Sequence, residues 1–504
     1  MKKIICLIFI LAGLEGVHVL AGTLYVDNIK GNDLNNGRQT SANDGGSCGP
    51  VASLERALAL LQTSDRIEVM NTGKPYQRQY PGTQGVAYGV NVGGTVDAPV
   101  VIHGNGAVLS GLSVIPAEKW TAESGDIYSL PFWPMSNRYK LCKEQNDWLD
   151  GTPIWWVDGL AAANCKSMEE LSKTANGFWW NKSEKKVLFH LPDGKRIQDL
   201  KVEIPATAGI YISANHVMVK DFSVIFSWDD GFDAFGASKN IVFKNCFAYN
   251  NCGQGFSCHG ESCVYYEDCS AIRCASSGSC DVNGSNSTYK RCLFVHNTYE
   301  AGVYAHNDSI HHYEDCLIVG NSPFEQVWQL AHSKLNFYNC VFSGIPTQDI
   351  LKLESGSVCF KRCTIVDAKA VCAIPENGPG SIHMENCALA RCEKYFFKIP
   401  KNPDGRVVMT GNLYADGPGH YVGEELYGKK NWSDYLKAAP ERASEWKKVK
   451  FGGSLNSELA ETVKLMGSDR SEKPVGARLP PAVWERYFQL VKENVTPCGV
   501  IKND

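Results

Sequence analysis

The chain has 504 residues, of which 44% are hydrophobic and 21% charged, and its formal net charge at pH 7 is −4. A chain of this length can bury a large core without covalent cross-links. The nearly neutral balance, with no basic stripe, argues against nucleic acid as a partner. No apolar run approaches the roughly 18 residues of a membrane-spanning helix, so we expect no membrane span.

The first residues predict an export signal. Lys2 and Lys3 precede an apolar run over residues 4–13, and a small-residue cleavage site ends at Ala21. This is the pattern of a cleavable signal peptide. We expect residues 1–21 to be removed and the mature protein to be a secreted or periplasmic monomer.

Residues 22–115 predict an N-terminal cap and the first β-structure. A helix is expected over residues 51–61, where leucines recur on one face, and strands over residues 65–69 and 99–102. A helix here would cover the open end of the repeats that follow. Residues 116–205 interrupt the pattern, and we expect an insertion or side sheet there. Its tryptophans are Trp120, Trp133, Trp148, Trp155, Trp156, Trp179 and Trp180.

Residues 206–415 contain a repeat of 23 or 24 residues. Its central column is Phe222, Cys246, Cys269, Cys292, Cys316, Cys340, Cys363 and Cys387. Three residues before these lie Val219, Phe243, Tyr266, Tyr289, Tyr313, Phe337, Phe360 and Met384, and two residues after them lie Val224, Ala248, Ala271, Phe294, Ile318, Phe342, Ile365 and Leu389. Such a repeat predicts an all-β fold, a parallel β-helix whose columns stack at about 4.8 Å per coil.

The cysteines are interpreted first as core residues, because a buried free thiol behaves as a small hydrophobe. A disulfide framework is the alternative, since export permits disulfides and neighbouring coils bring Cα atoms within bonding range. After the repeat, residues 416–504 lose the β pattern. Helical stretches around residues 432–436 and 482–492 predict a tail that packs on the solenoid or closes its C-terminal end.

The opening Tyr25-Val26 with Gly31-Asn32-Asp33, the following helix and strand, and the repeat together resemble the pectate-lyase superfamily. The resemblance covers the mature chain apart from the tryptophan-rich insertion and the tail. It implies a right-handed single-stranded parallel β-helix that acts on or binds a polysaccharide. It does not fix the activity, because this fold carries several.

The segment Trp228-Asp229-Asp230-Gly231-Phe232-Asp233 is the strongest chemical signal. Clustered carboxylates suit a hard cation such as Ca²⁺, and the segment is similar to the calcium site of the family-nine pectate lyases. The resemblance implies a metal role for Asp229, Asp230 and Asp233. The family's earlier aspartate is replaced here by Ala208 and its lysine base by Ser257, and His259 is a candidate replacement for that base.

A hydrolase is the alternative. Polygalacturonase-type enzymes of this fold carry paired aspartates followed one coil later by Gly-His-Gly, and here the second motif is Gly253-Gln254-Gly255. In that chemistry one carboxyl group protonates the leaving oxygen while another activates water. A third possibility is a non-catalytic glycan-binding solenoid.

Strand alternation predicts which side chains face out. We expect Phe232, Phe256, Cys280, Val303, Trp328 and Leu351 to point inward. The outward columns would be Asp233, Ser257, Asp281, Tyr304, Gln329 and Lys352, followed by Phe235, His259, Asn283, His306, Ala331 and Glu354. Asp233 and Asp281 would then be about 9 to 10 Å apart, which leaves room for the water of an inverting hydrolase.

The favoured prediction is a lyase that cleaves a uronic-acid polysaccharide by β-elimination. The expected catalytic residues are His259, Asp281, Tyr304 and His306, with Ca²⁺ as the candidate cofactor. The expected substrate-binding residues are Trp228, Gln254, Ser257, Asn283, Gln329 and Lys352.

Overall fold

The computed structural model describes residues 21–43, 47–79, 86–131, 156–181, 183–297, 300–321, 325–345, 347–446 and 476–492. The predicted signal segment up to residue 20 and three of the insertion tryptophans, Trp133, Trp148 and Trp155, lie outside these residues. Within them, no helix is long and apolar enough to cross a bilayer.

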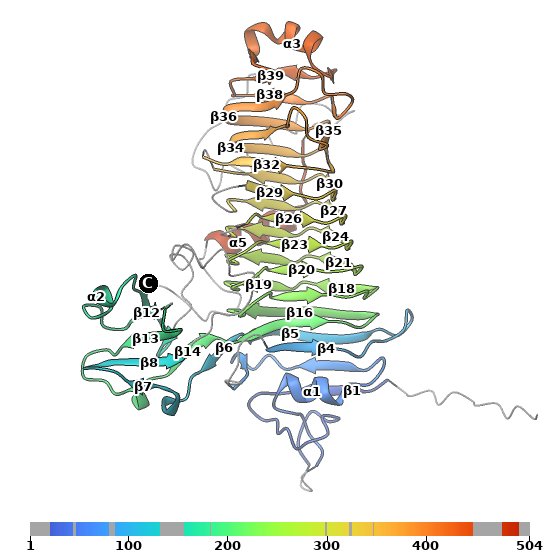
Figure 1. Ribbon diagram of the computed structural model, residues 1–504. Helices are drawn as coiled ribbons and strands as arrows, with labels where there is room; N and C mark the ends of the chain where they lie inside the picture. The colour runs from blue at the N-terminus through green and yellow to red at the C-terminus, as the bar shows by residue number, and fades with distance from the viewer. Residues whose placement is uncertain are drawn as a thin grey trace, which may run out of the picture.

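Short parallel strands stack into a long solenoid with three walls (Figure 1). The first wall contains β4 (Val86–Val90), β15 (Thr207–Ile212), β17 (Phe232–Ala234), β20 (Phe256–Cys258), β23 (Ser279–Val282), β26 (Val303–His306), β29 (Glu325–Gln329) and β32 (Asp349–Leu353). The second contains β1 (Thr23–Val26), β2 (Arg66–Val69), β18 (Ile241–Lys244), β21 (Cys263–Glu267), β24 (Asn286–Lys290), β27 (Ile310–Glu314), β30 (Lys334–Tyr338), β33 (Ser357–Lys361), β35 (Ser381–Glu385), β37 (Val407–Thr410) and β41 (Glu441–Arg442).

The third wall contains β3 (Tyr76–Gln77), β19 (Phe247–Tyr249), β22 (Ser270–Ile272), β25 (Leu293–Val295), β28 (Leu317–Val319), β31 (Val341–Ser343), β38 (Leu413–Ala415) and β42 (Glu445–Trp446). Four long strands turn a corner between walls: β5 (Val100–Ser110), β16 (Val217–Ile225), β34 (Thr364–Ala373) and β36 (Ala388–Ile399). β39 (His420–Val422) continues from β36 and pairs antiparallel with β40 (Glu425–Tyr427). The rungs therefore extend beyond residue 415, where we expected the β pattern to end.

A left-handed turn precedes every cysteine of the central column. The residues there have φ between 50° and 56° and are Asn245, Asp268, Arg291, Asp315, Asn339, Arg362 and Asn386. Asparagine and aspartate tolerate this conformation better than most residues. Each turn is fixed by its neighbour, because its backbone N–H donates to a carbonyl of the next rung, as from Asn245 to Glu267 at 2.8 Å. The turn ends the second wall and directs the following cysteine inward.

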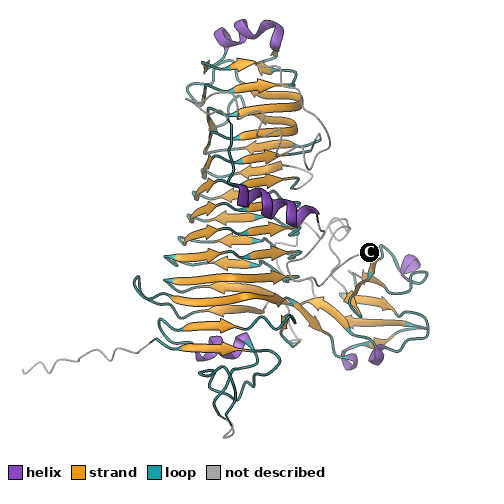
Figure 2. Cartoon of the chain, turned by 180° about the vertical axis from the view of Figure 1, so that it is seen from behind, coloured by secondary structure: helices purple, strands orange, loops and turns teal. Residues whose placement is uncertain are grey.

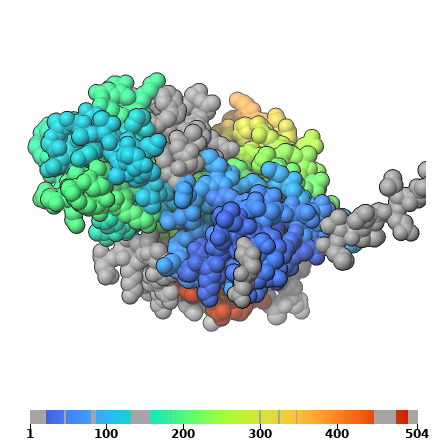
Figure 3. Space-filling view, turned by 90° about the horizontal axis from the view of Figure 1, so that it is seen from below, coloured from blue at the N-terminus to red at the C-terminus, as the bar shows by residue number. Residues whose placement is uncertain are grey.

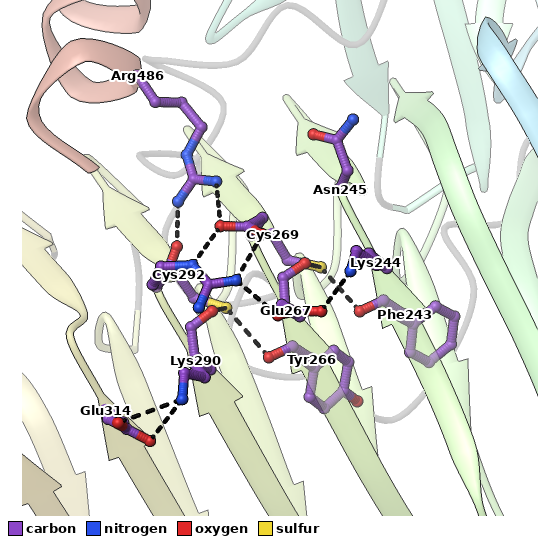
Figure 4. A network of polar contacts seen from close by, with 12 residues as sticks. Phe243, Lys244, Asn245, Tyr266, Glu267, Cys269, Lys290, Cys292, Glu314 and Arg486 are labelled. Atoms are coloured by element: carbon purple, nitrogen blue, oxygen red, sulfur yellow. Dashed lines mark hydrogen bonds and ion pairs between the residues drawn. The ribbon is translucent and has the colours of Figure 1, made fainter. Parts of the chain in front are cut away.

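The inward thiols bond across rungs. The Sγ of Cys269 donates to the carbonyl oxygen of Phe243 at 3.4 Å, and that of Cys292 donates to Tyr266 at 3.7 Å (Figure 4). Burial raises the pKa of the Cys269 thiol, so it stays protonated and able to donate. Every cysteine among the described residues is a free thiol. Beside the thiols the aromatic column stacks face to face, with Tyr266 and Tyr289 centroids 4.3 Å apart.

Two small sheets stand beside the N-terminal part of the solenoid, as the view from below also shows (Figure 3). One contains β6 (Leu112–Val114), β9 (Trp156–Val157), β10 (Leu160–Ala161) and β14 (Val202–Pro205), and the other contains β7 (Thr121–Ala122), β8 (Ile127–Pro131), β11 (Ala163–Asn164), β12 (Gly177–Asn181) and β13 (Lys186–His190). Trp120 packs on Phe178 and Phe189 in a core that also contains Trp228 of the solenoid. We call these two sheets the side sheets.

The described residues contain few helices, and these are short. They are α1 (Leu54–Leu60), α2 (Met168–Leu171), α3 (Trp432–Ala438), α5 (Pro481–Lys492) and the 3₁₀ turns η1 (Ala117–Lys119), η4 (Ile197–Asp199) and η5 (Lys429–Asn431). Figure 1 places α1 at the N-terminal end of the solenoid and α3 at the other. Helix α5 lies across the back (Figure 2), where Val483 and Tyr487 bury against the third wall. Arg486 of α5 forms an ion pair with Asp268 and donates to the Arg291 carbonyl (Figure 4).

The C-terminal end encloses a buried polar cluster. Tyr435 of α3 donates to Glu441 at 2.6 Å and its hydroxyl lies 3.3 Å from Nδ1 of His420, which is fully buried. Burial lowers the pKa of His420 to about 3 and raises the pKa of Glu441. The folded protein therefore resists protonation of His420, whereas the unfolded chain does not.

This difference predicts acid sensitivity. Because the folded pKa of His420 is depressed, its contribution to the free energy of unfolding is full above the unfolded value of about 6.5 and falls as the pH drops toward 3, by about 2 kcal/mol at pH 5. We expect His420→Gln to flatten the decline between pH 7 and pH 5, measured as the urea midpoint. Glu441 acts in the opposite direction but is present in both proteins. His383→Gln, at an exposed histidine, is the control, and equal slopes in all three proteins would contradict this account.

The thiol column predicts selective labelling. Cys246 to Cys387 of the column are buried, whereas Cys48, Cys263 and Cys359 are half-buried. Among the described cysteines of the native protein, iodoacetamide should modify Cys48, Cys263 and Cys359 first and leave the column unmodified, because the reagent needs an accessible thiolate. After unfolding in urea, all should react. Peptide mass spectrometry reads both states. Column cysteines that stay unreactive in urea but react after reduction would show disulfides instead.

Candidate functional site

The turn before β17 contains Asp229 and Asp230, and we call it the aspartate turn. It is built by close packing between two rungs. Asp230 is 1% exposed, and its Oδ1 accepts the backbone N–H of Gln254 at 2.8 Å. The Ser227 hydroxyl donates to the Asp230 carbonyl at 2.8 Å and fixes the turn. A Cβ on Gly253 would lie 2.5 Å from Asp230 Oδ1. Glycine at 253 is therefore required by the approach of the next rung to this carboxylate.

Three side chains converge on the outward face of the first wall. Asp230, Asp233 and His259 each offer a ligand atom, and these atoms all lie within 4.8 Å of one another. Asp233 and His259 come from successive rungs, because Asp233 pairs with Ser257 and His259 follows two residues later. We call Asp230, Asp233 and His259 the acid–histidine cluster.

Two contacts of His259 are made through the same nitrogen. Its Nε2 lies 2.6 Å from Ser257 Oγ and 3.8 Å from Asp233 Oδ1. An imidazole nitrogen within reach of a hydroxyl group and a carboxylate suits a proton-transfer or ligand group.

The carboxylates dominate the local electrostatics. Tyr211, one rung earlier, donates from its hydroxyl to Asp229 Oδ2 at 3.0 Å. Burial and the charges of Asp230, Asp229 and Asp233 raise the pKa of Tyr211 well above its usual value. Its phenol therefore stays protonated and serves as a hydrogen-bond donor or an acid, not as a base.

The cluster fits a divalent cation, although not with the predicted ligand set. Two carboxylates and an imidazole within reach of one point are a common donor set for such ions. Asp229 is not part of the group, because its side chain turns toward Tyr211. Asp230 and Asp233 belong both to this group and to the calcium site expected from the resemblance, and calcium binding stays a prediction.

Asp281 does not face the solvent, contrary to our prediction. The pairing of β20 with β23 sets Ser257 opposite Cys280 and Cys258 opposite Asp281. Cys280 is therefore in the outward column and Asp281 points into the solenoid, where it is 0% exposed. A register shift of one residue moves a side chain to the other face. The predicted acid–base pair of Asp233 and Asp281 does not exist.

Inside the solenoid, Asp281 is held by a closed polar network. Its carboxylate accepts from Ser287 at 2.9 Å and from Tyr289 at 3.0 Å, and lies 3.1 Å from His311 Nδ1. Ser309 in turn contacts His311 Nε2 at 2.6 Å. These side chains are buried, so the network is structural.

Other predicted site residues are also displaced. Gln329 points inward at 0% exposed, because Trp328 takes the outward position opposite Tyr304. Trp228 is buried in the core shared with the side sheets, and Gln254 is 4% exposed. In the second outward column, Leu330 and not Ala331 follows His306, because β26 pairs Ala305 with Gln329. These corrections follow from one-residue differences in the turns that lead into the first wall.

Of the remaining predicted residues, none joins the acid–histidine cluster. Tyr304 pairs with Cys280 and lies three rungs from Asp233, at about 14 Å in strand spacing. His306 pairs with Val282. We had predicted Asn283 in that place of the outward column. Asn283 is exposed, in a left-handed turn. Lys352 faces outward opposite Trp328.

Sequence reasoning missed Tyr211 and Trp328. Tyr211 pairs directly with Asp233 and so belongs to the same outward column. Strand alternation through Ile210 and Ile212, both buried, would have revealed it. Trp328 was predicted to point inward in the place that Val327 takes opposite Val303.

The family model described as the right handed beta helix region matches residues 208–350. This match confirms the right-handed parallel β-helix predicted from the repeat and the resemblance. It does not separate the family-nine pectate lyases from other β-helix proteins, so that resemblance stays a prediction. A comparison with curated proteins found no match.

Several solved structures are similar over most of their length. A rhamnogalacturonan lyase is 11% identical with a TM-score of 0.42, and the match covers 93% of this chain and 99% of that one. A glycoside hydrolase is 11% identical with a TM-score of 0.38, at 92% and 98% coverage. The GH136 lacto-N-biosidase from Eubacterium ramulus is 10% identical with a TM-score of 0.31, at 85% and 68% coverage.

The interior position of Asp281 predicts a stability defect without a catalytic one. Asp281→Ala leaves Ser287, Tyr289 and His311 without their shared acceptor and should lower the free energy of unfolding by roughly 3 kcal/mol or more. Urea denaturation followed by circular dichroism measures this loss. Asp308→Asn, at an exposed left-handed position that asparagine tolerates, is the control. An Asp281→Ala protein as stable as the control would refute the structural role.

Proposed function

We propose that this protein is a lyase that cleaves a uronic-acid-containing polysaccharide by β-elimination at the acid–histidine cluster. The observation that carries the proposal is the convergence of Asp230, Asp233 and His259 on the outward face of the first wall. The His259 side chain keeps 16% exposure beside the two buried carboxylates, so it is the member of the cluster that a sugar chain would meet first.

The reaction requires three events. A base removes the proton at C5 of the uronate, the electrons of that C–H bond form a C4=C5 double bond, and the bond from C4 to the glycosidic oxygen breaks. The departing oxygen takes up a proton. We assign proton removal to His259, which Ser257 orients from 2.6 Å. Tyr211, whose raised pKa keeps its phenol protonated, is the candidate donor to the leaving oxygen.

The negative charge of a uronate substrate must be neutralised beside these carboxylates, since like charges repel. Asp230 and Asp233 would hold a divalent cation, with Ca²⁺ as the first candidate, and the cation would neutralise the uronate carboxylate and so acidify the C5 proton. Asp230 is kept in place by the Gln254 N–H, and Asp233 by its strand β17. The chain thus contributes fixed ligands and a separate base.

The position of Asp281 favours a lyase over a hydrolase. A hydrolase needs one carboxyl group as acid and a second on the opposite side of the scissile bond. With Asp281 inside the solenoid, the carboxylates of the predicted site, Asp229, Asp230 and Asp233, all come from one short segment, which is the turn before β17 and that strand itself. An elimination needs a base and charge neutralisation, which the cluster supplies.

The proposal predicts a specific loss of activity. Asp233→Asn and His259→Gln should each lower the rate of unsaturated-product formation by roughly 100-fold or more, with an unchanged unfolding midpoint. The product is detected by its ultraviolet absorbance on a panel of galacturonate, guluronate, mannuronate and glucuronate polymers. Chelator should abolish the signal and added Ca²⁺ should restore it. Asp308→Asn and His312→Gln, both exposed and away from the cluster, are matched controls.

Two outcomes would contradict the proposal. New reducing ends without unsaturated product would show a hydrolase. Binding without any cleavage, unaffected by chelator, would show a glycan-binding solenoid.

A further inference from the structure

A second group of side chains lies on the outward face of the first wall, farther along the solenoid. The strand pairings place Tyr304 opposite Trp328 and Trp328 opposite Lys352 on three successive rungs. All three are half-buried and outward-facing. We call Tyr304, Trp328 and Lys352 the distal group.

The distal group is held by its own contacts. The ring of Tyr304 meets that of Trp328 edge to face, with centroids 5.6 Å apart and planes at 83°. The ammonium nitrogen of Lys352 lies 4.0 Å from the Trp328 ring centroid, which is a cation–π contact. Lys352 also forms an ion pair with Glu354 at 3.2 Å, yet its side chain keeps 40% exposure. The two perpendicular rings and the ammonium group are therefore fixed relative to one another before any ligand binds.

The outward face of the second wall shows what a merely solvated face looks like here. Its charges alternate between rungs and neutralise one another, as in the pairs Lys244–Glu267 at 2.8 Å, Lys290–Glu314 at 3.3 Å and Lys361–Glu385 at 3.2 Å. The outward column of the first wall has no such alternation among its described residues. It runs Asp233, Ser257, Cys280, Tyr304, Trp328, Lys352.

This order matches an extended acidic sugar chain. Between the acid–histidine cluster and the distal group the column offers two small residues, Ser257 and Cys280, at 0% and 5% exposed, which form a low floor. Trp328 lies four rungs from Asp233, at about 19 Å. A sugar residue in an extended polysaccharide is about as long as one rung is high. The aromatic rings suit the apolar faces of sugar rings, and Lys352 suits a carboxylate.

We propose that Tyr304, Trp328 and Lys352 form a distal subsite for a uronate residue, so that the polysaccharide lies along the solenoid axis and is held at an internal position of a long chain. This inference rests on the proposed function for the reacting end, but its own evidence is the distal group. It implies that recognition requires a chain of several residues and that Lys352 selects for the carboxylate.

The test measures affinity against chain length. In a His259→Gln background, in which cleavage is slowed by the roughly 100-fold expected above and the carboxylates are kept, calorimetry follows the binding of galacturonate, guluronate and glucuronate oligomers from dimer to octamer. For the oligomer series that binds, affinity should rise once the chain spans both sites. Adding Lys352→Gln or Trp328→Ala should remove that rise, a loss of roughly tenfold or more for the octamer. Lys361→Gln, an exposed lysine with the same 3.2 Å ion pair on the second wall, should keep the rise.

Carboxyl-reduced octamers separate charge from shape. They should bind equally to the Lys352→Gln protein and its parent, because the carboxylate that Lys352 recognises is gone. If Trp328→Ala lowers the unfolding midpoint, its loss of affinity could come from misfolding, and the test then depends on Lys352→Gln alone.

The inference fails if Lys352→Gln behaves like Lys361→Gln, or if reduced octamers lose as much affinity on Lys352→Gln as the acidic ones. The two proposals fail separately. Cleavage of a uronate polymer with no length-dependent effect of Lys352 would overturn the subsite and keep the lyase. Length-dependent, Lys352-sensitive binding without cleavage would keep the subsite and overturn the lyase.

Discussion

The left-handed turn before each column cysteine is the constraint on which the rest of the solenoid depends. A residue with φ near 50° ends the second wall, donates its N–H to the next rung, and turns the following side chain inward. The inward position must be small and must tolerate a carbonyl from the neighbouring rung. Cysteine meets both needs, since its thiol donates to that carbonyl. Phe222 occupies the same position only where Gly104 lies against its ring, at a place where a Cβ would clash.

Because this turn repeats at a nearly constant spacing, the second and third walls could be predicted from the sequence. The central cysteines and the aromatic column behind them are buried as expected. Parallel pairing transfers the register of one rung to the next, so one correct rung fixes its neighbours. The right-handed sense of the coil and the expectation of a polysaccharide substrate came from the resemblance to the pectate-lyase superfamily, and not from this periodicity.

The first wall could not be predicted in the same way. The segments that lead into it contain Gly253-Gln254-Gly255 in one rung and Ser276-Ser277-Gly278 in the next, and a side chain's face depends on where the strand begins. Aligning Phe256 with Cys280 instead of Ser279 placed Asp281 outside, and aligning Val303 with Trp328 instead of Val327 placed Trp328 inside. The polar interior partners of Asp281, which include Tyr289 of the aromatic column, gave no local signal. Only the three-dimensional stack shows that a tyrosine hydroxyl can satisfy a carboxylate in the core.

The position of the candidate site follows from what covers the other walls. The third wall has an apolar outward face, and α5 and Trp156 of the side sheets pack on it. The second wall neutralises its own charges between rungs. The outward face of the first wall instead carries acidic, polar, aromatic and basic side chains on successive rungs. At its beginning, Trp228 is buried in the side-sheet core while Asp230 is bound by the next rung. The aspartate turn is thus held from both sides, which lets the fold keep the buried carboxylates close together, where the proposed cation would compensate their charges.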